Sequence, residues 1–310
     1  MSYVSARAVR FDQYGDRSVL HVVDVPIPVP ARGEVLVAIR AAAINPGETN
    51  IRTGALHDRF PATFPSGEGT DLAGVVTSIG PDVTEFAVGD EVLGFSWARS
   101  SHATHATVPA TQLIPKPLQL EWTVAGSLAV AGCAAYAAVR AVEARSGETV
   151  AVSAAAGGVG SIVTQMLVAR GVRVLGIASA ASEAWLTANG AIPIPYGDRL
   201  RENVLALAPD GVDAFIDLFG PEYVQLAADL GIPCGRIETL IAFDKAHELG
   251  TKAEGGASAS TREVLAELAA LVVAGTVQIP IATTYPLDKV AQAFAELEQR
   301  HTHGKIVLLP

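Results

Sequence analysis

The feature that most constrains the fold is a glycine-rich turn at 153–160, which reads Ser-Ala-Ala-Ala-Gly-Gly-Val-Gly. It follows the apolar run 149–152 and opens the segment 159–169, where apolar residues recur at helical spacing. A strand, a tight glycine turn and a helix start form the phosphate-binding corner of a dinucleotide fold, because glycines let the backbone approach a pyrophosphate closely and the helix N-terminus supplies N–H donors. A turn before any buried helix would look similar, but the strand before it and the helix after it favour cofactor binding.

Length, charge and cysteine content limit the class of protein. The 310 residues suggest two domains. A net charge of −10 argues against nucleic acid or an anionic membrane as the main partner. We find no apolar run of about 18 residues and no N-terminal signal segment. The two cysteines, Cys133 and Cys234, lack metal-ligand spacing, and a reduced, cytoplasmic setting is the simplest interpretation.

The order of expected elements changes along the chain. Residues 1–124 carry short strand-like segments punctuated by proline and glycine, which resembles a small, irregular barrel. The strands expected there are 6–11, 20–25, 34–43, 74–79 and 91–95.

After residue 124, strands alternate with helices, which implies βαβ units and a parallel sheet of the α/β class. The expected strands are 148–153, 172–177, 213–218 and 235–242. The expected helices are 159–170, 182–189, 198–207 and 221–230. Two further helices, at 263–274 and 287–299, precede a closing strand at 304–309.

Three further stretches make the chain resemble the medium-chain dehydrogenase/reductase superfamily. Spaced glycines between 74 and 92 are similar to the superfamily's N-terminal barrel, and Ala-Ile-Asn-Pro at 43–46 resembles the start of its substrate cleft. His-Gly-Lys-Ile-Val-Leu at 303–308 resembles its C-terminal strand. The resemblance implies a GroES-like β-barrel catalytic domain, 1–124 and 250–310, and an inserted Rossmann domain with a doubly wound parallel sheet, 125–249.

The resemblance also indicates a branch without zinc. Zinc alcohol dehydrogenases of this superfamily carry Gly-His-Glu where this chain has Gly-Thr-Asp at 69–71, so Thr70 replaces the metal-binding histidine. The four-cysteine structural-zinc lobe is missing between 94 and 115. His102 and His105 lack a nearby cysteine and are interpreted as surface or packing residues. The chain therefore resembles the zinc-independent quinone oxidoreductase-like family, and we expect no metal.

The second Rossmann strand favours NADPH over NADH. No carboxylate precedes Glu183 after this strand, so nothing repels a 2′-phosphate, and Ser179 can donate a hydrogen bond to it. The resemblance places Tyr196 on the same phosphate, but puts Ser182 where the family has lysine, which leaves NADH open. The expected cofactor contacts are Ala155, Gly157, Gly158, Val159, Cys133, Ser179, Ser182, Tyr196, Phe219, Ile241, Phe243 and Lys305.

Several of these contacts have an alternative interpretation. The resemblance places Cys133 next to the nicotinamide, but free cysteine commonly packs, and we favour packing. Phe219, Ile241 and Phe243 follow the carboxyl ends of Rossmann strands, where ligands bind, yet apolar side chains there also suit the core. Lys305 lies near the cofactor phosphates in one interpretation and is an ordinary surface lysine in the other.

The catalytic candidates are Asn45, Glu48 and Asn50. Asn45 matches the family's cleft asparagine, whose amide can donate to a carbonyl oxygen, although asparagine before proline also favours a turn. The family often has Asp and Tyr where this chain has Glu48 and Asn50. Glu48 either supports the cleft by hydrogen bonding, with Arg52 as a possible partner, or is a solvated loop carboxylate.

The resemblance implies an NADPH-dependent, zinc-independent reductase that passes a hydride to an electron-poor small molecule, either a quinone or an α,β-unsaturated carbonyl. Two alternatives stay open: reduction of a double bond in a specialised metabolite, and a cofactor-binding redox sensor with little catalysis. The family also implies a homodimer, with the strand near 235–242 and the loop 243–260 at the interface.

Overall fold

A computed structural model describes residues 5–310 of the chain. Contacts within the chain divide it into two compact units, which are described separately. Unit 1 runs to Val130 and takes in Thr261–Val273 and Ile281–Pro310. Unit 2 comprises Ala131–Ser260 and Ala274–Pro280. The expected domain boundaries at 124/125 and 249/250 fall six and eleven residues before the changes of unit at 130/131 and 260/261, and the short return of unit 2 at 274–280 is not expected from the sequence.

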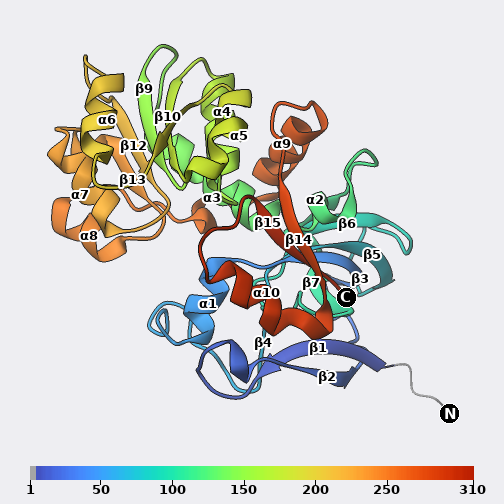
Figure 1. Ribbon diagram of the computed structural model, residues 1–310. Helices are drawn as coiled ribbons and strands as arrows, with labels where there is room; N and C mark the ends of the chain where they lie inside the picture. The colour runs from blue at the N-terminus through green and yellow to red at the C-terminus, as the bar shows by residue number, and fades with distance from the viewer. Residues whose placement is uncertain (1–4) are drawn as a thin grey trace. The chain divides into compact units, whose positions relative to one another are not determined.

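Unit 2 is built on a five-stranded sheet in the order β11-β10-β9-β12-β13, in which every neighbouring pair is parallel. Helices lie on both sides of this sheet (Figure 1), as a doubly wound Rossmann fold requires. Its strands are β9 (Thr149–Ser153), β10 (Arg173–Ala178), β11 (Ile192–Pro195), β12 (Ala214–Asp217) and β13 (Ile237–Thr239). Its helices are α4 (Gly160–Ala169), α5 (Glu183–Ala188), α6 (Leu200–Leu207), α7 (Pro221–Asp229) and α8 (Phe243–Leu249).

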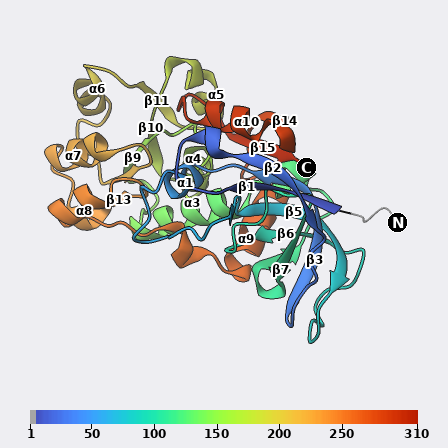
Figure 2. The same cartoon turned by 90° about the horizontal axis from the view of Figure 1, so that it is seen from below.

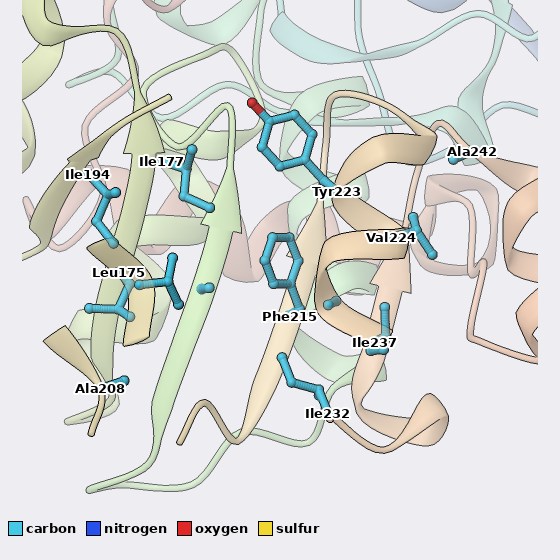
Figure 3. Packing of buried hydrophobic residues seen from close by; sticks show 13 residues of the cluster. Leu175, Ile177, Ile194, Ala208, Phe215, Tyr223, Val224, Ile232, Ile237 and Ala242 are labelled. Carbon is cyan, nitrogen blue, oxygen red and sulfur yellow. The ribbon is translucent and has the colours of Figure 1, made fainter. Parts of the chain in front are cut away.

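One face of this sheet carries a continuous apolar core. Phe215 of β12 is fully buried and lies beside Tyr223 and Val224 of α7, and the fully buried Leu175 of β10 extends the same cluster toward Ile194 of β11 (Figure 3). A parallel sheet covered on both faces needs such uninterrupted apolar strands. The alternation of strands and helices in the sequence therefore predicts this fold class correctly.

Several elements of unit 2 differ from the expected ones, among them the helix α8 in the expected loop 243–260. The expected strand at 235–242 is confined to Ile237–Thr239, because the Thr239 hydroxyl accepts hydrogen bonds from the backbone of Ile241 and Ala242 and turns the chain. The strand β11 is not expected from its sequence Ile-Pro-Ile-Pro, yet it pairs with β10 at the edge of the sheet, where proline is tolerated.

Unit 1 combines a seven-stranded sheet, in the order β14-β15-β3-β5-β6-β8 with β7 paired to β3, and a three-stranded sheet in the order β2-β1-β4. The first half of its strands comprises β1 (Ser5–Phe11), β2 (His21–Pro26), β3 (Glu34–Ala43), β4 (Ser66–Gly67) and β5 (Asp71–Ile79). The others are β6 (Glu91–Phe95), β7 (His105–Pro109), β8 (Leu113–Pro115), β14 (Ile281–Pro286) and β15 (Lys305–Leu309). Its helices are α1 (Pro46–Arg52), α2 (Trp122–Ala125), α9 (Arg262–Val273) and α10 (Val290–Leu297), and the helix α3 (Ala129–Ala141) begins in it.

The strand β15 joins the last segment of the chain to the first. It pairs in parallel with β14 and antiparallel with β3, so residues near 307 lie beside residues near 43. The helix α10 packs against β14 and β15 (Figure 2), burying Val290 and Phe294 at helical spacing. The expected GroES-like domain built from both ends of the chain is thus confirmed as a fold.

None of the helices in the described part of the chain has the length and apolar character that a membrane crossing requires.

Candidate functional site

The glycine-rich turn of unit 2 lies between β9 and α4, at the carboxyl edge of the sheet. Ala155 is buried and its N–H donates to the carbonyl of Ile177 on β10, while Gly157 donates to Ala154 over 2.9 Å. The side chain of Thr164 on α4 donates back to the carbonyl of Ala155 over 3.1 Å. These bonds fix the turn against the start of a ten-residue helix, whose N–H groups at 161–163 donate to the carbonyls of Gly157 and Val159 in the turn itself.

The turn is tight enough to demand small residues. A Cβ added at Gly160 would lie 2.0 Å from the carbonyl oxygen of Ala154, and one at Gly157 would lie 3.2 Å from the same oxygen. Ala154 itself has φ of 48°, in the left-handed region. Gly157, Gly158 and Val159 are half-buried, so the backbone of the turn is accessible. A closely approachable backbone at a helix N-terminus fits the pyrophosphate of a dinucleotide.

Two hydroxyl groups lie just after β10. The Oγ atoms of Ser179 and Ser182 are 3.3 Å apart, and both residues are half-buried. Tyr196 follows β11, the neighbouring strand, where its backbone N–H donates to the carbonyl of Ala178 and its side chain is 50% exposed. The carboxyl end of β10 therefore presents hydroxyl donors and no carboxylate before Glu183, and the end of β11 adds the hydroxyl of Tyr196, with Asp198 two residues further on.

A buried carboxylate ties together the ends of three strands in unit 2. Asp217 accepts hydrogen bonds from the hydroxyls of Ser153 on β9 and Thr239 on β13, each over 2.7 Å. It also accepts from the backbone N–H groups of Phe219 and Gly220. Burial raises the pKa of Asp217, while these hydrogen bonds oppose the rise. This network, which sequence reasoning missed, sets the backbone that carries two of the expected cofactor contacts.

The apolar cofactor candidates have different exposures. Phe219 and Phe243 are half-buried, and Ile241 is exposed, which an ordinary core residue would not be. Cys133 on α3 is fully buried, as packing requires. The contacts of these residues with a cofactor stay predictions.

The catalytic candidate of unit 1, Asn45, lies in a buried polar cluster. Its Nδ2 donates to Asp71 Oδ2 over 3.0 Å and, more weakly, to Glu48 Oε1 over 3.4 Å. Its Oδ1 accepts from Lys305 Nζ over 2.5 Å. Asn45, Glu48, Asp71 and Lys305 are all at most 6% exposed. The four come from three distant segments that meet where β3, β5 and β15 lie in one sheet.

Glu48 is a structural partner of the backbone around Asn45. Its Oε2 accepts from the Asn45 N–H over 2.8 Å, which closes a capping box on α1, and its Oε1 accepts from the Thr70 N–H over 3.0 Å. Burial raises the pKa of Glu48 to about 7; the hydrogen bond from Asn45 and the charge of Lys305 oppose the rise, and the charge of Asp71 adds to it. The interpretation of Glu48 as a solvated loop carboxylate is therefore wrong.

Arg52 does not pair with Glu48. Its fully buried guanidinium donates to Glu68 over 3.1 Å and to Glu298 on α10 over 2.9 Å, and it lies 4.4 Å from the centre of the Phe294 ring. The expected Glu48–Arg52 pair is thus wrong. Glu68 and Glu298 lie too far along the chain for spacing to reveal them, and the arginine instead ties α1 to α10.

His102 is buried beside this cluster rather than on the surface. Its Nε2 lies 3.2 Å from the carbonyl of Ala43 and 3.9 Å from Glu48 Oε2. Burial lowers the pKa of His102 to about 4, so its imidazole is neutral at physiological pH. This is the packing role expected from the sequence, at a place where the ring also contacts polar groups.

Asn50 lies apart from the buried cluster. It shares α1 with Glu48 but is exposed, and its carbonyl accepts from Leu56 and from the Thr53 hydroxyl. Asp71 is visible in the sequence only as the last residue of Gly-Thr-Asp at 69–71 and is not expected in the site, because its partners Asn45 and Lys305 are far from it along the chain. Its Oδ1 accepts from the Val130 N–H at the start of α3 over 2.7 Å.

The residues of this cluster do not fit a zinc ion. Between residues 5 and 310, no group of three or more His, Cys, Asp or Glu side chains is arranged to hold a metal. The carboxylate of Asp71 lies 3.5 Å from the Lys305 ammonium, which would repel a cation at the same place. Lysine carries no lone pair while charged and supplies no metal ligand.

Two family profiles together match most of the chain. The profile described as "Alcohol dehydrogenase GroES-like domain" matches residues 31–196, and the profile described as "Zinc-binding dehydrogenase" matches residues 194–308. The second match concerns a segment that begins within β11 and ends in β15.

Relatives and solved structures cover nearly the whole chain. The quinone oxidoreductase of Mus musculus is 31% identical over 98% of this chain and 97% of its own length. The quinone oxidoreductase from Coxiella burnetii has a TM-score of 0.87 at 28% identity, with 99% of both chains covered. A mycobacterial protein solved in complex with NADPH has a TM-score of 0.86 at 28% identity, covering 99% of this chain and 100% of its own.

Proposed function

The chain belongs to the medium-chain dehydrogenase/reductase superfamily as a quinone oxidoreductase-like oxidoreductase, and on that premise we propose that it is an NADPH-dependent, zinc-independent reductase of electron-poor small molecules. The acceptor is a quinone or an α,β-unsaturated carbonyl. The observation that carries the proposal is the approachable glycine turn at the start of α4, next to a strand that ends in hydroxyls rather than a carboxylate.

Residues of the turn and the strand ends would hold the cofactor. The backbone at 157–159 would bind the pyrophosphate, and the Phe219 and Ile241 segments, fixed by Asp217, would border the nicotinamide. The hydroxyls of Ser179, Ser182 and Tyr196 would bind the 2′-phosphate, which is the support for NADPH over NADH. The complex of the mycobacterial relative with NADPH is consistent with this choice.

The bound cofactor supplies a hydride to the acceptor. With one proton from solvent or a bound water, a quinone becomes a hydroquinone and an enal becomes a saturated aldehyde, so two electrons and two hydrogens are accounted for. The chain must steady the negative charge that develops on the acceptor oxygen. Asn45 is the proposed donor, because its 3.4 Å bond to Glu48 is long and is the one that a substrate oxygen would replace.

The proposal includes a homodimer in a cytoplasmic setting, as the family resemblance implies. The strand β13 is the last of its sheet, although the Thr239 N–H and the Ile237 carbonyl on its outer side already bond to Lys252. The expected interface loop 243–260 contains the helix α8, so the partner would meet a helix and a short strand rather than a loop. Sedimentation of the purified protein tests this part separately from the chemistry.

The test is anaerobic oxidation of NADPH by the purified protein with a panel of quinones and enals, with NADH run beside it. We expect NADPH to be preferred about tenfold in kcat/KM, because two hydroxyl hydrogen bonds are together worth about 1.4 kcal/mol or more. The double variant Ser179→Ala/Ser182→Ala should lose this preference, and Ser146→Ala, in a loop away from these strand ends, is the matched control.

Each other outcome changes the assignment. A preference for NADH would overturn the roles of Ser179, Ser182 and Tyr196. NADPH that binds but is not consumed would reject the reductase for these acceptors. It would leave a specialised-metabolite double bond as the substrate, or a redox-sensing role without turnover.

A further inference from the structure

Lys305 is a buried lysine whose three N–H donors all face acceptors inside unit 1. Its Nζ lies 2.5 Å from Asn45 Oδ1, 3.3 Å from the carbonyl of Ile44 and 3.5 Å from Asp71 Oδ2. The residue is 5% exposed, at the first position of β15. A long, charged side chain is buried only when its charge is compensated, so this arrangement holds the ammonium at one place.

The neighbours of Asn45 allow one orientation of its amide. Oδ1 faces the ammonium, and Nδ2 faces the carboxylates of Asp71 and Glu48. Turning the amide over would set Nδ2 against the ammonium and Oδ1 against two carboxylates, which replaces attraction by repulsion on both sides. Among the charged side chains around this amide, Lys305 alone donates to the oxygen, and the Glu48 backbone N–H of the capping box approaches it from the same side.

We infer that Lys305 is a positioning residue that acts through Asn45: its hydrogen bond holds the amide oxygen so that Nδ2 stays available as the donor, and its positive charge strengthens that donor. A charged donor on the oxygen draws electron density from the amide nitrogen and polarises its N–H bonds. The catalytic part of this inference rests on the proposed function, in which Asn45 Nδ2 binds the acceptor oxygen. The orientation of the amide does not depend on it.

This role differs from the expected contact between Lys305 and the cofactor phosphates. A phosphate contact would require the ammonium to give up one of its three acceptors within unit 1. The two roles predict different kinetics. A positioning residue for Asn45 affects the turnover of bound substrate, whereas a phosphate ligand affects the affinity for NADPH.

The first test observes Asn45 directly and needs neither substrate nor cofactor. The chain has four asparagines, at 45, 50, 189 and 203, so selective nitrogen-15 labelling gives four side-chain amide signals, and Asn45→Ala assigns one of them. We expect Lys305→Met to shift or split the Asn45 signal and to leave the other three in place. Met keeps the length and the unbranched shape of lysine while removing its charge.

Lys116→Met is the matched control. Lys116 is also buried in unit 1, with Nζ 3.0 Å from Glu91 and 3.3 Å from the carbonyl of Pro117, and it lies 4.5 Å from the centre of the Trp122 ring. The substitution Lys116→Met removes the same charge and a similar set of contacts, and Lys116 does not touch Asn45. An unshifted Asn45 signal in Lys305→Met, or an equal shift in Lys116→Met, would overturn the orienting role.

The second test is kinetic. We expect Lys305→Met to lower kcat about tenfold to a hundredfold, less than the loss of a whole oxyanion donor, with KM for NADPH changed less than about twofold. In an Asn45→Ala background the same substitution should have no further effect on kcat. A raised KM for NADPH at unchanged kcat would reject the inference in favour of a phosphate contact. If the wild type turns over no acceptor, the proposed function fails while the amide signal still decides the orientation.

Discussion

At the residue scale, burial competes with pairing in the charged side chains of unit 1. Glu68 accepts a hydrogen bond from Arg52, which lowers its pKa, yet burial is the larger effect and the charge of Glu48 adds to it, so the pKa of Glu68 rises to about 8. We therefore treat the contact with Arg52 as a hydrogen bond to a protonated carboxyl at neutral pH. A buried pair of this kind is weak support for stability but fixes geometry.

This assignment predicts a pH dependence of stability. Between the ordinary glutamate pKa of 4.5 and the raised pKa of about 8, folded Glu68 keeps a proton that the unfolded chain has released. Its stabilising contribution is complete below that window and is lost as the pH rises through 8, with a slope of about 1.4 kcal/mol per pH unit. Glutamine does not titrate, so the Glu68→Gln variant lacks this dependence of unfolding free energy on pH. The free energy of unfolding of the wild type should therefore fall relative to that of Glu68→Gln between pH about 5 and 8.

Urea unfolding of the wild type and Glu68→Gln across this range measures the difference. Glu248→Gln, at an exposed position on α8, is the control and should follow the wild type. If the unfolding free energies of the wild type and Glu68→Gln change in parallel with pH across this range, Glu68 is ionised in the folded protein.

At the element scale, the turn between β9 and α4 is restricted by one carbonyl. The oxygen of Ala154 lies where a side chain at Gly160 would begin, and the positive φ of Ala154 turns that oxygen inward. The strand before the turn and the helix after it are predictable from the sequence, because glycine, apolar runs and helical spacing are local signals. The contact between Ala154 and Gly160 is also local, and it explains why the glycine at 160 is needed.

The restriction predicts that Gly160→Ala damages the turn. A methyl group 2.0 Å from a backbone oxygen cannot be accommodated without moving the start of α4, which costs about 1–3 kcal/mol of unfolding free energy. NADPH affinity should fall at least about tenfold, since the helix N-terminus moves with it. In Gly157→Ala the added Cβ would lie 3.2 Å from the same oxygen, so this variant should lose clearly less unfolding free energy and less NADPH affinity.

Calorimetric melting and titration with NADPH measure the two effects. Wild-type affinity in Gly160→Ala would remove the turn from the cofactor site, whatever its effect on stability.

Elements with weak local signals were not predictable. The edge strand β11 contains Pro193 and Pro195, which disfavour a strand except at an edge, and the sequence alone does not say which strand is the edge. The helix α1 has only seven residues and opens with Pro-Gly. The site was predictable only in part, because Asn45 has a recognisable motif, whereas its contacts with Asp71 and Lys305 join segments that sequence order keeps apart.

At the scale of the whole molecule, unit 1 depends on contacts between distant parts of the chain, and unit 2 is nearly continuous in sequence. The strand β15 fills the place between β14 and β3, and its residues Ile306, Val307 and Leu308 are fully buried or nearly so. Unit 1 therefore has an incomplete sheet and an incomplete Asn45 cluster until its last strand is in place.

We predict that Val307→Asp destabilises unit 1 strongly. Val307 is fully buried and paired with Ala43, so an aspartate there has no partner for its charge and costs at least about 3 kcal/mol. Leu309→Asp, two residues further on the same strand, at a position that is 38% exposed, is the control and should cost less than about 1 kcal/mol.

Limited proteolysis with mapping of the fragments tests this prediction. In Val307→Asp, cleavage should concentrate within unit 1 while 131–260 resists. Equal susceptibility of the two variants would show that β15 adds little to the stability of unit 1.

The place of β15 in the sheet also has a consequence for synthesis on the ribosome. Every strand of the unit 2 sheet has been synthesised once translation has passed Thr239. In unit 1, the strand β15 that lies between β3 and β14 is synthesised only with residues 305–309. Domains fold as units while the chain is still emerging, so the inserted unit matures first and its host last. Until then, β3 is a nascent edge that exposes unpaired backbone groups near Ala42 and Ile44, and a chain stalled before the last strand offers chaperones and proteases that edge to bind.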